Sequence, residues 1–599
     1  MRLGLSLIVG ACGHGPTNEE LCEVNPRSRA DAAIGIKGRC YRTMPPVAVA
    51  LSHLLAYRRM TSTSTNCCCR HERNNRLKHK GFRRVLNTDT HQTTAVCNPE
   101  HRLLVIEHIP YELQLSSAAM KSVLAAAMAS FFLLNAATPS SAADSTGSLD
   151  PSTTLIRIRD AAMGSDWAYT ELAALTDGIG PRLSGSAQHQ AAIIRMAAAM
   201  RTLGAQVRLQ DIKVPHWVRG EEIAKLVEYP GRPDQVTQTL QLTTLGGSSA
   251  TPQAGLKAGV IVVHDFDELR ARAAEARGKI VLFDVIFDQR LARNGRATKA
   301  YGQSGLYRFN GPAMAAEAGA IAALVRSIGG ADYRLPHTGM TTWHEKQSPI
   351  PCAALASEDA DLVSRLAAKG PVTMSLLLTP KSLPEADSSN VIADWQGTEK
   401  PNEYVIVSGH LDSWDLGTGA TDDGVGVMAA AGVIEVLKSL NLHARRTIRF
   451  IAWTNEENGG RGSKGYFDSV KEQLASQVAA IESDEGAGRS LGVAAAVTRE
   501  SLSVLKPVVG TLSSIGATIL ERHEENLGSD IGPLQAAGVP GFAPAVDTEH
   551  YFDYHHTAAD TLDKVDPNNL HSQVATMAVL AYYLADLADP LPRFSTSTR

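Results

Sequence analysis

The sequence predicts an α/β protein with a central, mostly parallel mixed sheet flanked by helices and with an inserted β-rich domain. Two observations predict this class. After residue 386, short apolar runs that suit strands alternate with longer apolar runs that suit helices, as in sheets built from parallel strands. Between residues 246 and 385, short β-rich runs are instead separated by glycine, aspartate and proline, which is typical of a smaller domain rich in turns.

The part of the chain before the inserted domain is expected to be helical. Residues 154–210 have the composition of helices with short breaks, and the Ala-rich run 191–203 predicts a strong helix that Gly204 would end. Inside the inserted segment we expect strands at 260–263 and 279–283, a helix over 313–326 and an extended stretch after 348–351.

After residue 386 we expect strands at 404–408, 447–453, 479–481 and 493–497, and helices at 425–440 and 570–587. The run 404–408 (YVIVS) is apolar, as expected for a strand that is buried on both faces. Ligands of such sheets bind at the carboxyl ends of the strands, so the residues directly after these strands are the candidates for function.

The overall composition excludes several classes of protein. An apolar content of 44%, with 49 glycines and 28 prolines, is typical of an ordinary globular protein. No stretch approaches the roughly 18 apolar residues that span a bilayer, which excludes a polytopic membrane protein. A formal net charge of -4 gives no support for nucleic acid as a partner.

Residues 1–119 differ from the rest in charge and in cysteine content. They carry 16 basic and 9 acidic residues and seven of the eight cysteines, three of them adjacent at 67–69. Adjacent cysteines do not easily share one tetrahedral site, and the segment has no CxxC pair, which argues against a zinc-binding or basic nucleic-acid arm. The segment has no sustained helical or strand period, and we expect it to be disordered.

A secretory signal peptide is predicted to begin at Met120. Lys121 gives the positive start, residues 123–134 give an apolar core of roughly a dozen residues, and 140–143 (SSAA) give a small-residue cleavage site. We therefore expect translation to start at Met120, residues 1–119 to be a misassigned upstream extension, and the product to be periplasmic or secreted. A rival start at Met1 reads like a lipoprotein signal, but its apolar core is too short to compete well.

Five motifs with acidic residues or histidine lie just past an expected strand or in a loop. They are SGHLDSWD (His410, Asp412), GATDDGVG (Asp422, Asp423), TNEENGG (Glu456, Glu457), IESDEG (Glu482, Asp484, Glu485) and YHHTAADT (His555, His556). Each motif alone is common without function, because DDG is usually a solvated turn and EEN usually starts a helix. Together they supply histidine nitrogens and carboxylate oxygens at strand ends, which are ligands that zinc takes.

This combination predicts a hydrolytic site with two metal ions. A carboxylate can bridge two metals about 3.5–4 Å apart, which is the spacing used for hydrolytic attack. In an HxD motif the carboxylate can orient the imidazole. Of the adjacent Glu456 and Glu457, one can bind metal while the other acts as the general base toward the attacking water. The sequence has no GxSxG elbow, Cys–His pair or Walker loop that would offer a competing chemistry.

Residues 150–590 resemble the di-zinc exopeptidases, and most closely the plasma glutamate carboxypeptidase family, also called carboxypeptidase Q. The segments 245–252 (LGGSSATP), 318–327 (AGAIAALVRS) and 336–339 (PHTG) resemble the protease-associated segment of that family. The resemblance implies the zinc exopeptidase fold and two Zn²⁺ per chain. The implied organisation is a signal peptide at 120–143, a first catalytic part at 144–245, an inserted protease-associated domain at 246–385, a zinc-binding catalytic domain at 386–590 and a tail at 591–599.

The resemblance also implies a role for each motif residue. It implies one zinc on His410 and Asp484, the other on Glu457 and His556, and Asp422 as the bridge between them. It further implies that Glu456 is the general base and that Asp412 orients His410. His555 is the alternative ligand, but the ligand of the family stands directly before Thr or Ser, which favours His556.

Three further expectations complete this interpretation. The resemblance implies a cis peptide bond between Asp422 and Asp423, and it implies a homodimer. Glu482 and Glu485 are expected to be solvated or to lie behind the ligands. Arg461 and Lys464 lie near the expected base and could hold a substrate carboxylate, although solvation is the commoner role of such residues.

The expected function is the hydrolysis of dipeptides or of terminal residues of short peptides, as a carboxypeptidase or dipeptidase. The sequence leaves an aminopeptidase of the same clan as an alternative, because the loops that would hold the free terminus carry no recognisable code. A binding ectodomain without metals and a glutaminyl cyclase are further alternatives. The intact Glu456, Glu457 and Asp484 argue against these last two.

Overall fold

The computed structural model describes residues 94–97, 103–106, 151–330 and 333–596 of the chain. The chain divides into two units, residues 1–140 and 141–599. In the first unit the described residues are two antiparallel strands, β1 (Thr94–Cys97) and β2 (Leu103–Ile106), in a segment for which we expected no regular element. The expected signal peptide at 120–143 and the remainder of 1–119 lie outside the described residues.

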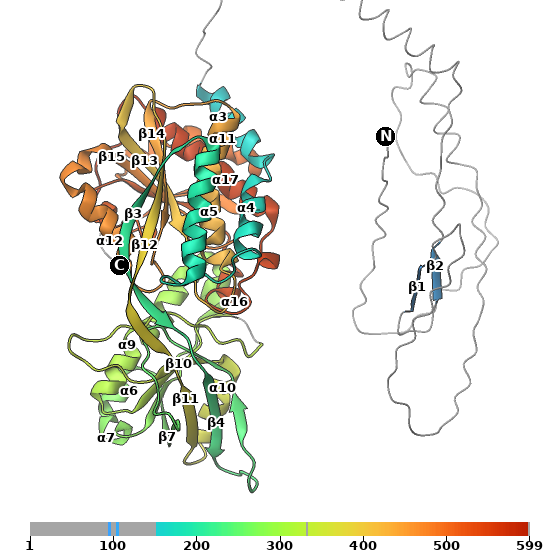
Figure 1. Cartoon of the computed structure of the whole chain (residues 1–599), viewed down its shortest axis with the longest axis vertical. Helices are drawn as coiled ribbons and strands as arrows, with labels where there is room; N and C mark the ends of the chain where they lie inside the picture. Colours follow the sequence, from blue (N-terminus) through green and yellow to red (C-terminus); the bar gives the residue numbers. More distant parts are fainter. Residues whose placement is uncertain (1–93, 98–102, 107–150, 331–332, 597–599) are drawn as a thin grey trace, which may run out of the picture. The chain divides into compact units, whose positions relative to one another are not determined.

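The second unit contains two eight-stranded sheets, and the first of them is the expected α/β sheet (Figure 1). Its strands, in the order in which they pair, are β17 (Ile519–Arg522), β16 (Ser490–Ala496), β18 (Gly541–Val546), β15 (Gln477–Glu482), β13 (Lys400–His410), β14 (Arg446–Trp453), β12 (Lys381–Trp395) and β3 (Gln206–Val218). The central strands β18, β15, β13 and β14 are parallel to their neighbours within this group, whereas β12 and β3 are antiparallel. The sheet is therefore mixed with a parallel centre, as predicted.

Helices cover both faces of this sheet (Figure 1). The larger layer consists of α3 (Pro151–Met163), α4 (Trp167–Thr176), α5 (Ala187–Leu203), α11 (Val425–Ser439) and α17 (Pro567–Asp586), with the short α13 (Ser501–Val504) and α14 (Lys506–Leu512) beside it. The opposite face is covered by α12 (Arg461–Val470) and α15 (Gly532–Ala536). Val405 and Val407 of β13 face the first layer and Ile406 faces the second, so this strand is apolar because both of its faces are buried.

The second sheet is built from the segment between β3 and β12. Its strands, in pairing order, are β5 (Gln238–Leu240), β4 (Glu222–Glu228), β11 (Thr373–Leu378), β7 (Leu256–Val263), β8 (Ile280–Phe283), β9 (Ala322–Arg326), β10 (Cys352–Leu355) and β6 (Leu242–Thr244). Its helices are α6 (Phe266–Ala271), α7 (Ala273–Ala276), α8 (Gln289–Leu291), α9 (Ala297–Glu317) and α10 (Ser357–Ala367). The sheet begins at Glu222, upstream of the expected boundary at 246, because β4 pairs with the late strand β11.

Two long strands carry the chain from one sheet to the other. β3 and β12 pair antiparallel from Gln206 opposite Asp394 to Val218 opposite Lys381. Figure 1 shows this two-stranded ribbon running from the first sheet toward the second. The inserted segment therefore enters and leaves through neighbouring strands.

Most of the expected elements are present. α5 ends at Leu203, and Gly204 caps it with a φ of 94°. The expected strands at 260–263, 279–283, 404–408, 447–453, 479–481 and 493–497 lie within or overlap β7, β8, β13, β14, β15 and β16, and the helices at 425–440 and 570–587 correspond to α11 and α17. Within the described residues, no helix is both long enough and apolar enough to cross a bilayer.

The helix predicted over 313–326 is wrong in its second half. α9 ends at Glu317, Gly319 turns the chain with a φ of 82°, and Ala322–Arg326 forms β9. The run Ala-Ala-Leu-Val is buried between β8 and β10, to which it pairs in parallel. Local composition favoured a helix, but the pairing with two neighbouring strands decides the structure.

Candidate metal centre

The candidate site lies at the carboxyl ends of three adjacent parallel strands. His410 is the last residue of β13, Glu456 and Glu457 follow β14, and Asp484 follows β15. β13 pairs in parallel with both β14 and β15, so the three strands end at the same edge. The structure therefore places three of the five groups of candidate residues where open α/β sheets bind ligands.

Asp422 reaches this edge from the turn Ala420–Gly424 that precedes α11. The peptide bond between Asp422 and Asp423 is cis, as the resemblance implied. Asp423 points back into the protein, where its carboxylate accepts hydrogen bonds from the backbone N–H groups of His410 (2.9 Å) and Gly426 (3.1 Å). The two adjacent aspartates thus do different things: Asp423 fastens the turn to β13, and Asp422 faces the site.

His555 and His556 come from the loop after the short helix α16 (Tyr551–Tyr554). His556 has a φ of 60°, and its Nδ1 lies 3.2 Å from the carbonyl oxygen of Thr338, in the inserted segment. Since a carbonyl only accepts, Nδ1 carries a proton, which leaves Nε2 as the nitrogen that can bind a metal. The inserted segment therefore helps to orient a candidate ligand.

The structure brings the five predicted metal ligands together around Asp422. Asp422 Oδ1 lies 3.2 Å from His410 Nε2, and Asp422 Oδ2 lies 3.3 Å from His556 Nε2. On the outer sides, His410 Nε2 lies 3.4 Å from Asp484 Oδ1, and His556 Nε2 lies 3.0 Å from Glu457 Oε2. The two oxygens of Asp422 therefore face two different sets of ligand atoms.

The chemistry of this donor set fits metal ions. Asp422 Oδ2 is buried and makes no well-aligned hydrogen bond to any residue that the structure describes. A small cleft at this place is lined by eight residues, among which are Asp422, Glu457 and His556. Nitrogen lone pairs and carboxylate oxygens that converge on buried space are what a divalent cation such as zinc requires.

The electrostatics of the buried groups also favour a bound metal ion. Burial and the neighbouring Asp422 raise the pKa of Glu457 to about 8, and burial raises the pKa of Asp484 to about 7. Burial lowers the pKa of His410 and His556, but the nearby carboxylates outweigh it and hold both pKa values well above the ordinary value. The site thus gathers carboxylates that repel one another, and a bound cation would relieve that repulsion.

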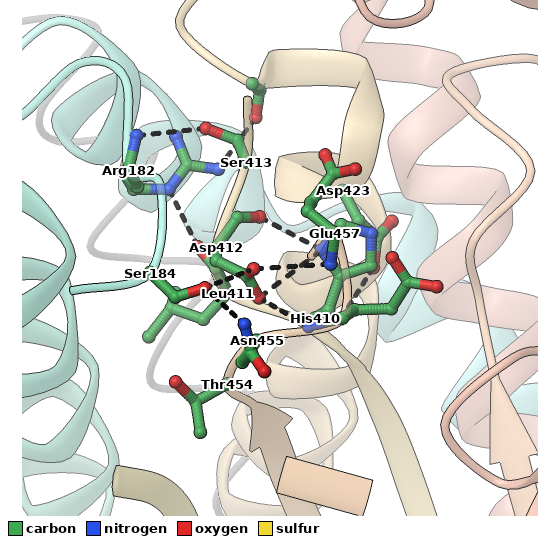
Figure 2. A network of polar contacts seen from close by, with 12 residues as sticks. Arg182, Ser184, His410, Leu411, Asp412, Ser413, Asp423, Thr454, Asn455 and Glu457 are labelled. Atoms are coloured by element: carbon green, nitrogen blue, oxygen red, sulfur yellow. Dashed lines mark hydrogen bonds and ion pairs between the residues drawn. The ribbon is translucent and has the colours of Figure 1, made fainter. Parts of the chain in front are cut away.

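Asp412 acts on its neighbours through different atoms than expected. Its carboxylate oxygen lies 4.0 Å from His410 Nδ1, whereas its backbone carbonyl oxygen lies 2.9 Å from the same nitrogen. The carboxylate instead accepts hydrogen bonds from the backbone N–H groups of Glu456 (3.1 Å) and Glu457 (3.4 Å) and from the hydroxyl of Ser184 (3.1 Å). Figure 2 shows Asp412 beside Ser184, His410 and Glu457. Asp412 therefore positions the backbone of both glutamates as well as the histidine.

The sequence analysis did not single out two residues that hold the site together. The carboxylate of Asp560 accepts from the N–H groups of Thr421 (2.6 Å) and Asp422 (3.2 Å), and burial together with Asp422 raises its pKa to about 6. Asp560 lies in the same YHHTAADT motif as the histidines, which was the signal available for it. Arg182 donates to the carbonyl oxygens of Gly180, Leu411, Thr418 and Gly419 and ties the loop before the bridging turn to the N-terminal part (Figure 2).

The remaining candidate residues lie in varied surroundings. Glu482 is fully buried, contrary to a solvated role, and accepts from the N–H groups of Asp530 and Ile531; burial raises its pKa to about 8. Glu485 accepts from the hydroxyl of Thr298. Arg461 and Lys464 are 48% and 70% exposed and pair with Glu385 and Asp468, so they face solvent.

Comparison with known proteins identifies the family. Residues 390–581 match the model of peptidase family M28, a range that contains every candidate ligand. Carboxypeptidase Q from Homo sapiens is 36% identical over 428 residues, which cover 71% of this chain and 87% of the human protein; the Xenopus laevis protein is 38% identical over 429 residues with the same shares. Aminopeptidase YwaD of Bacillus subtilis is 24% identical over 446 residues, which cover 71% of this chain and 86% of that protein.

A solved structure extends this likeness to three dimensions. The peptidase M28 precursor from Shewanella amazonensis SB2B superposes with a TM-score of 0.68 at 34% identity, and the match covers 75% of this chain and 99% of that one. A zinc aminopeptidase from Bacillus subtilis, at 21% identity and a TM-score of 0.52 over 72% of this chain and 98% of its own, shares the fold. The chain therefore belongs to peptidase family M28 and is an M28 zinc peptidase homologous to carboxypeptidase Q.

Proposed function

We propose that the protein is an exported di-zinc exopeptidase that hydrolyses dipeptides or removes terminal residues from short peptides. The observation that carries the proposal is the position of Asp422, whose two oxygens face two separate sets of nitrogen and oxygen ligands. A carboxylate placed in this way can serve two metal ions at once, which is the arrangement used for hydrolysis of amide bonds.

Five side chains would hold the two ions. His410 and Asp484 would bind one zinc, Glu457 and His556 the other, and Asp422 would belong to both. When bound, the ions supply Lewis acidity toward the scissile carbonyl and lower the pKa of the attacking water. The buried surroundings of these ligands exclude bulk water and strengthen every charge interaction inside the site.

Glu456 is the general base in this proposal. It is partly exposed, unlike the buried Glu457 beside it, so its carboxylate is available to a water molecule and a substrate. The hydrogen bonds from both glutamate N–H groups to Asp412 fix the backbone from which the carboxylate of Glu456 projects. Glu456 takes a proton from the attacking water and then returns it to the leaving amine.

The family resemblance supports the carboxypeptidase or dipeptidase assignment, because the relatives with the higher identity are carboxypeptidases Q. An aminopeptidase is the alternative, which the match to a Bacillus subtilis aminopeptidase keeps open. Export through the signal at 120–143, a protease-associated role for the second sheet and a homodimer belong to the same proposal. Mass spectrometry of the mature protein should find its N terminus near residue 143 or 144.

Cleavage of a panel of dipeptides, compared with tripeptides blocked at either end, tests the proposal. Protein stripped of metal by a chelator should be inactive and should regain activity with about two zinc ions per chain. A carboxypeptidase should cleave dipeptides and N-blocked tripeptides, a dipeptidase should cleave only the dipeptides, and both should reject tripeptides with a blocked carboxyl end. Cleavage of only the tripeptides with a free amino end would favour the aminopeptidase, and activity without metal would contradict the mechanism.

A further inference from the structure

Arg219 lies where the chain leaves the first sheet for the second. It directly follows β3 and stands just before β4, which begins at Glu222. Its side chain is only 12% exposed. All three nitrogen atoms of its guanidinium make hydrogen bonds, and their acceptors belong to both the catalytic part and the inserted segment. The residue therefore connects the two parts of the molecule.

One edge of this guanidinium binds a loop of the metal centre. Nε of Arg219 lies 2.9 Å from Oδ2 of Asp415, and Nη2 lies 2.6 Å from Oδ1, which makes a two-point ion pair. Asp415 directly follows Trp414, whose backbone N–H donates to Oε1 of Glu457 at 3.2 Å. Arg219 thus holds the loop that supports one of the proposed zinc ligands.

The other contacts of Arg219 are made with the inserted segment. Nη1 donates to the hydroxyl of Thr243 (2.7 Å) and to the carbonyl oxygen of Thr244 (2.6 Å), and it pairs with Glu222 at 2.9 Å. Nη2 donates to the hydroxyl of Thr338 at 3.2 Å, and that hydroxyl donates in turn to the carbonyl oxygen of Thr244 at 2.9 Å. The side chain of Thr338 is therefore fixed between Arg219 and Thr244.

Thr338 holds a second proposed zinc ligand at two points. Its backbone N–H donates to the carbonyl oxygen of His556 at 2.9 Å, and its own carbonyl oxygen lies 3.2 Å from Nδ1 of the same residue. His556 has a φ of 60°, a conformation that is uncommon for residues other than glycine and persists where the surrounding structure holds it. Thr338 therefore fixes both the backbone and the ring of His556.

We propose that Arg219 is a positioning residue for the zinc ion of Glu457 and His556, because it ties together the two segments that hold these ligands. The inference rests on the proposed function, which assigns both side chains to one ion. On the other side of the site, the ring of His410 is held by the backbone carbonyl of Asp412 at 2.9 Å, within the catalytic part. Loss of Arg219 should therefore weaken one of the two ions and spare the other.

Competition with a zinc chelator, using the full chain, measures the two affinities separately. Arg219→Gln should lower one of them by about 10- to 100-fold, the effect typical of residues that orient metal ligands. Arg219→Lys should lower it less, because the charge stays while the two-point contact is lost. Asp415→Asn, which leaves the arginine in place, should weaken the same ion.

Arg326→Gln is the matched control for these variants. Arg326 ends β9, its side chain is 10% exposed, and it pairs with Asp284 (2.9 Å) and Asp361 (2.6 Å) inside the inserted segment. This substitution also removes a largely buried ion pair, but it should leave both zinc affinities unchanged. An equal loss of both ions in Arg219→Gln and Arg219→Lys, or no loss in either, would overturn the proposal.

Cadmium NMR of the cadmium-loaded chain provides a readout that does not depend on turnover. Each bound ion should give its own signal, and His556→Ala identifies the signal of the ion beside Glu457. Arg219→Lys should shift that signal and leave the other in place, whereas a shift of both signals would show a general role in the fold and overturn the proposal. If the wild type binds two ions but cleaves no peptide, the proposed function fails, and the affinities and signals still decide the role of Arg219.

Discussion

The imidazole rings of His555 and His556 are stacked with their centres 3.6 Å apart, and both Nε2 atoms face the same oxygen, Asp422 Oδ2, at 3.4 and 3.3 Å. The two histidines differ in their other contacts and in the direction of their pKa shifts. His556 also reaches Glu457 and is oriented by Thr338, whereas Nδ1 of His555 has no hydrogen-bond partner in the described part of the chain. Burial and the adjacent His556 hold the pKa of His555 well below its ordinary value, so His555 is neutral at the edge of the site.

This difference predicts which histidine binds metal. His556→Ala should lower the zinc content toward one ion per chain and abolish turnover, because it removes a ligand shared with the Glu457 side. His555→Ala removes only a ring that packs against His556, and it should keep both ions with a smaller loss of kcat/KM. Elemental analysis of the two purified variants decides the matter; the reverse pattern would make His555 the ligand.

Substitutions of the adjacent Glu456 and Glu457 should likewise have different effects on turnover and on zinc content. Glu456→Ala should reduce kcat by about 10²–10⁴-fold with metal retained, since proton transfer typically contributes that much. Glu457→Ala should lose zinc, because Glu457 is buried and contacts His556 at 3.0 Å. Zinc content and single-turnover rates of both variants give the measurement. Near-normal turnover of Glu456→Ala would disprove its role, and zinc loss in that variant would show that the two residues have exchanged roles.

Asp560 should matter for metal affinity although it is not one of the proposed ligands. In the wild type, the carboxylate of Asp560 accepts hydrogen bonds from two backbone N–H groups. Asp560→Asn places an amide NH₂ against one of these donors, so the turn that presents Asp422 loses one of its two hydrogen bonds to residue 560. Substitution of a residue that holds a ligand in this way typically lowers the metal affinity by about 10- to 100-fold. Asp563→Asn, in an exposed position three residues later, is the control. Competition with a zinc chelator should show weakened binding only for Asp560→Asn.

The sequence predicted the site to the extent that its parts follow local patterns. The strand-end positions of His410, Glu457 and Asp484 followed from the sequence because each residue comes after an apolar strand, and parallel strands end at one edge. The ordering role of Asp412 was expected from its carboxylate, but the backbone carbonyl does this work, since a two-residue spacing does not specify which oxygen turns toward the imidazole. Thr338 could not be predicted, because it reaches the site from the inserted segment through tertiary packing alone.

The difference between local sequence patterns and tertiary packing also explains which elements of the fold could be predicted. The helix ending at Gly204 was predictable because the glycine both stops the apolar run and adopts a left-handed φ. The run 322–326 was not, because alanine, leucine and valine in a short buried segment suit a helix and a buried strand equally. Only its pairing with β8 and β10 makes it a strand.

The last prediction concerns two glycines of α11 that allow close packing for different reasons. A Cβ at Gly426 would lie 2.0 Å from the carbonyl oxygen of Ser483 and 2.2 Å from Oδ1 of Asp423, both of which belong to the framework of the metal site. A Cβ at Gly432 would instead meet the methyl groups of Val574 on α17 at 2.9 and 3.0 Å. A valine methyl group can shift by a small rotation, whereas the carbonyl of Ser483, between the end of β15 and Asp484, cannot move without moving a proposed ligand.

Gly426→Ala should therefore push α11 away from β15 and weaken zinc binding together with activity. Gly432→Ala should cost at most about 1–3 kcal/mol of overpacking, partly offset by roughly 1 kcal/mol from the better helix propensity of alanine, and should leave zinc affinity unchanged. Thermal unfolding of the zinc-free and zinc-loaded variants separates the two effects. The stabilisation gained on adding zinc should shrink for Gly426→Ala and match the wild type for Gly432→Ala, and equal gains in both variants would show that the contact of Gly426 with Ser483 is not needed to shape the metal site.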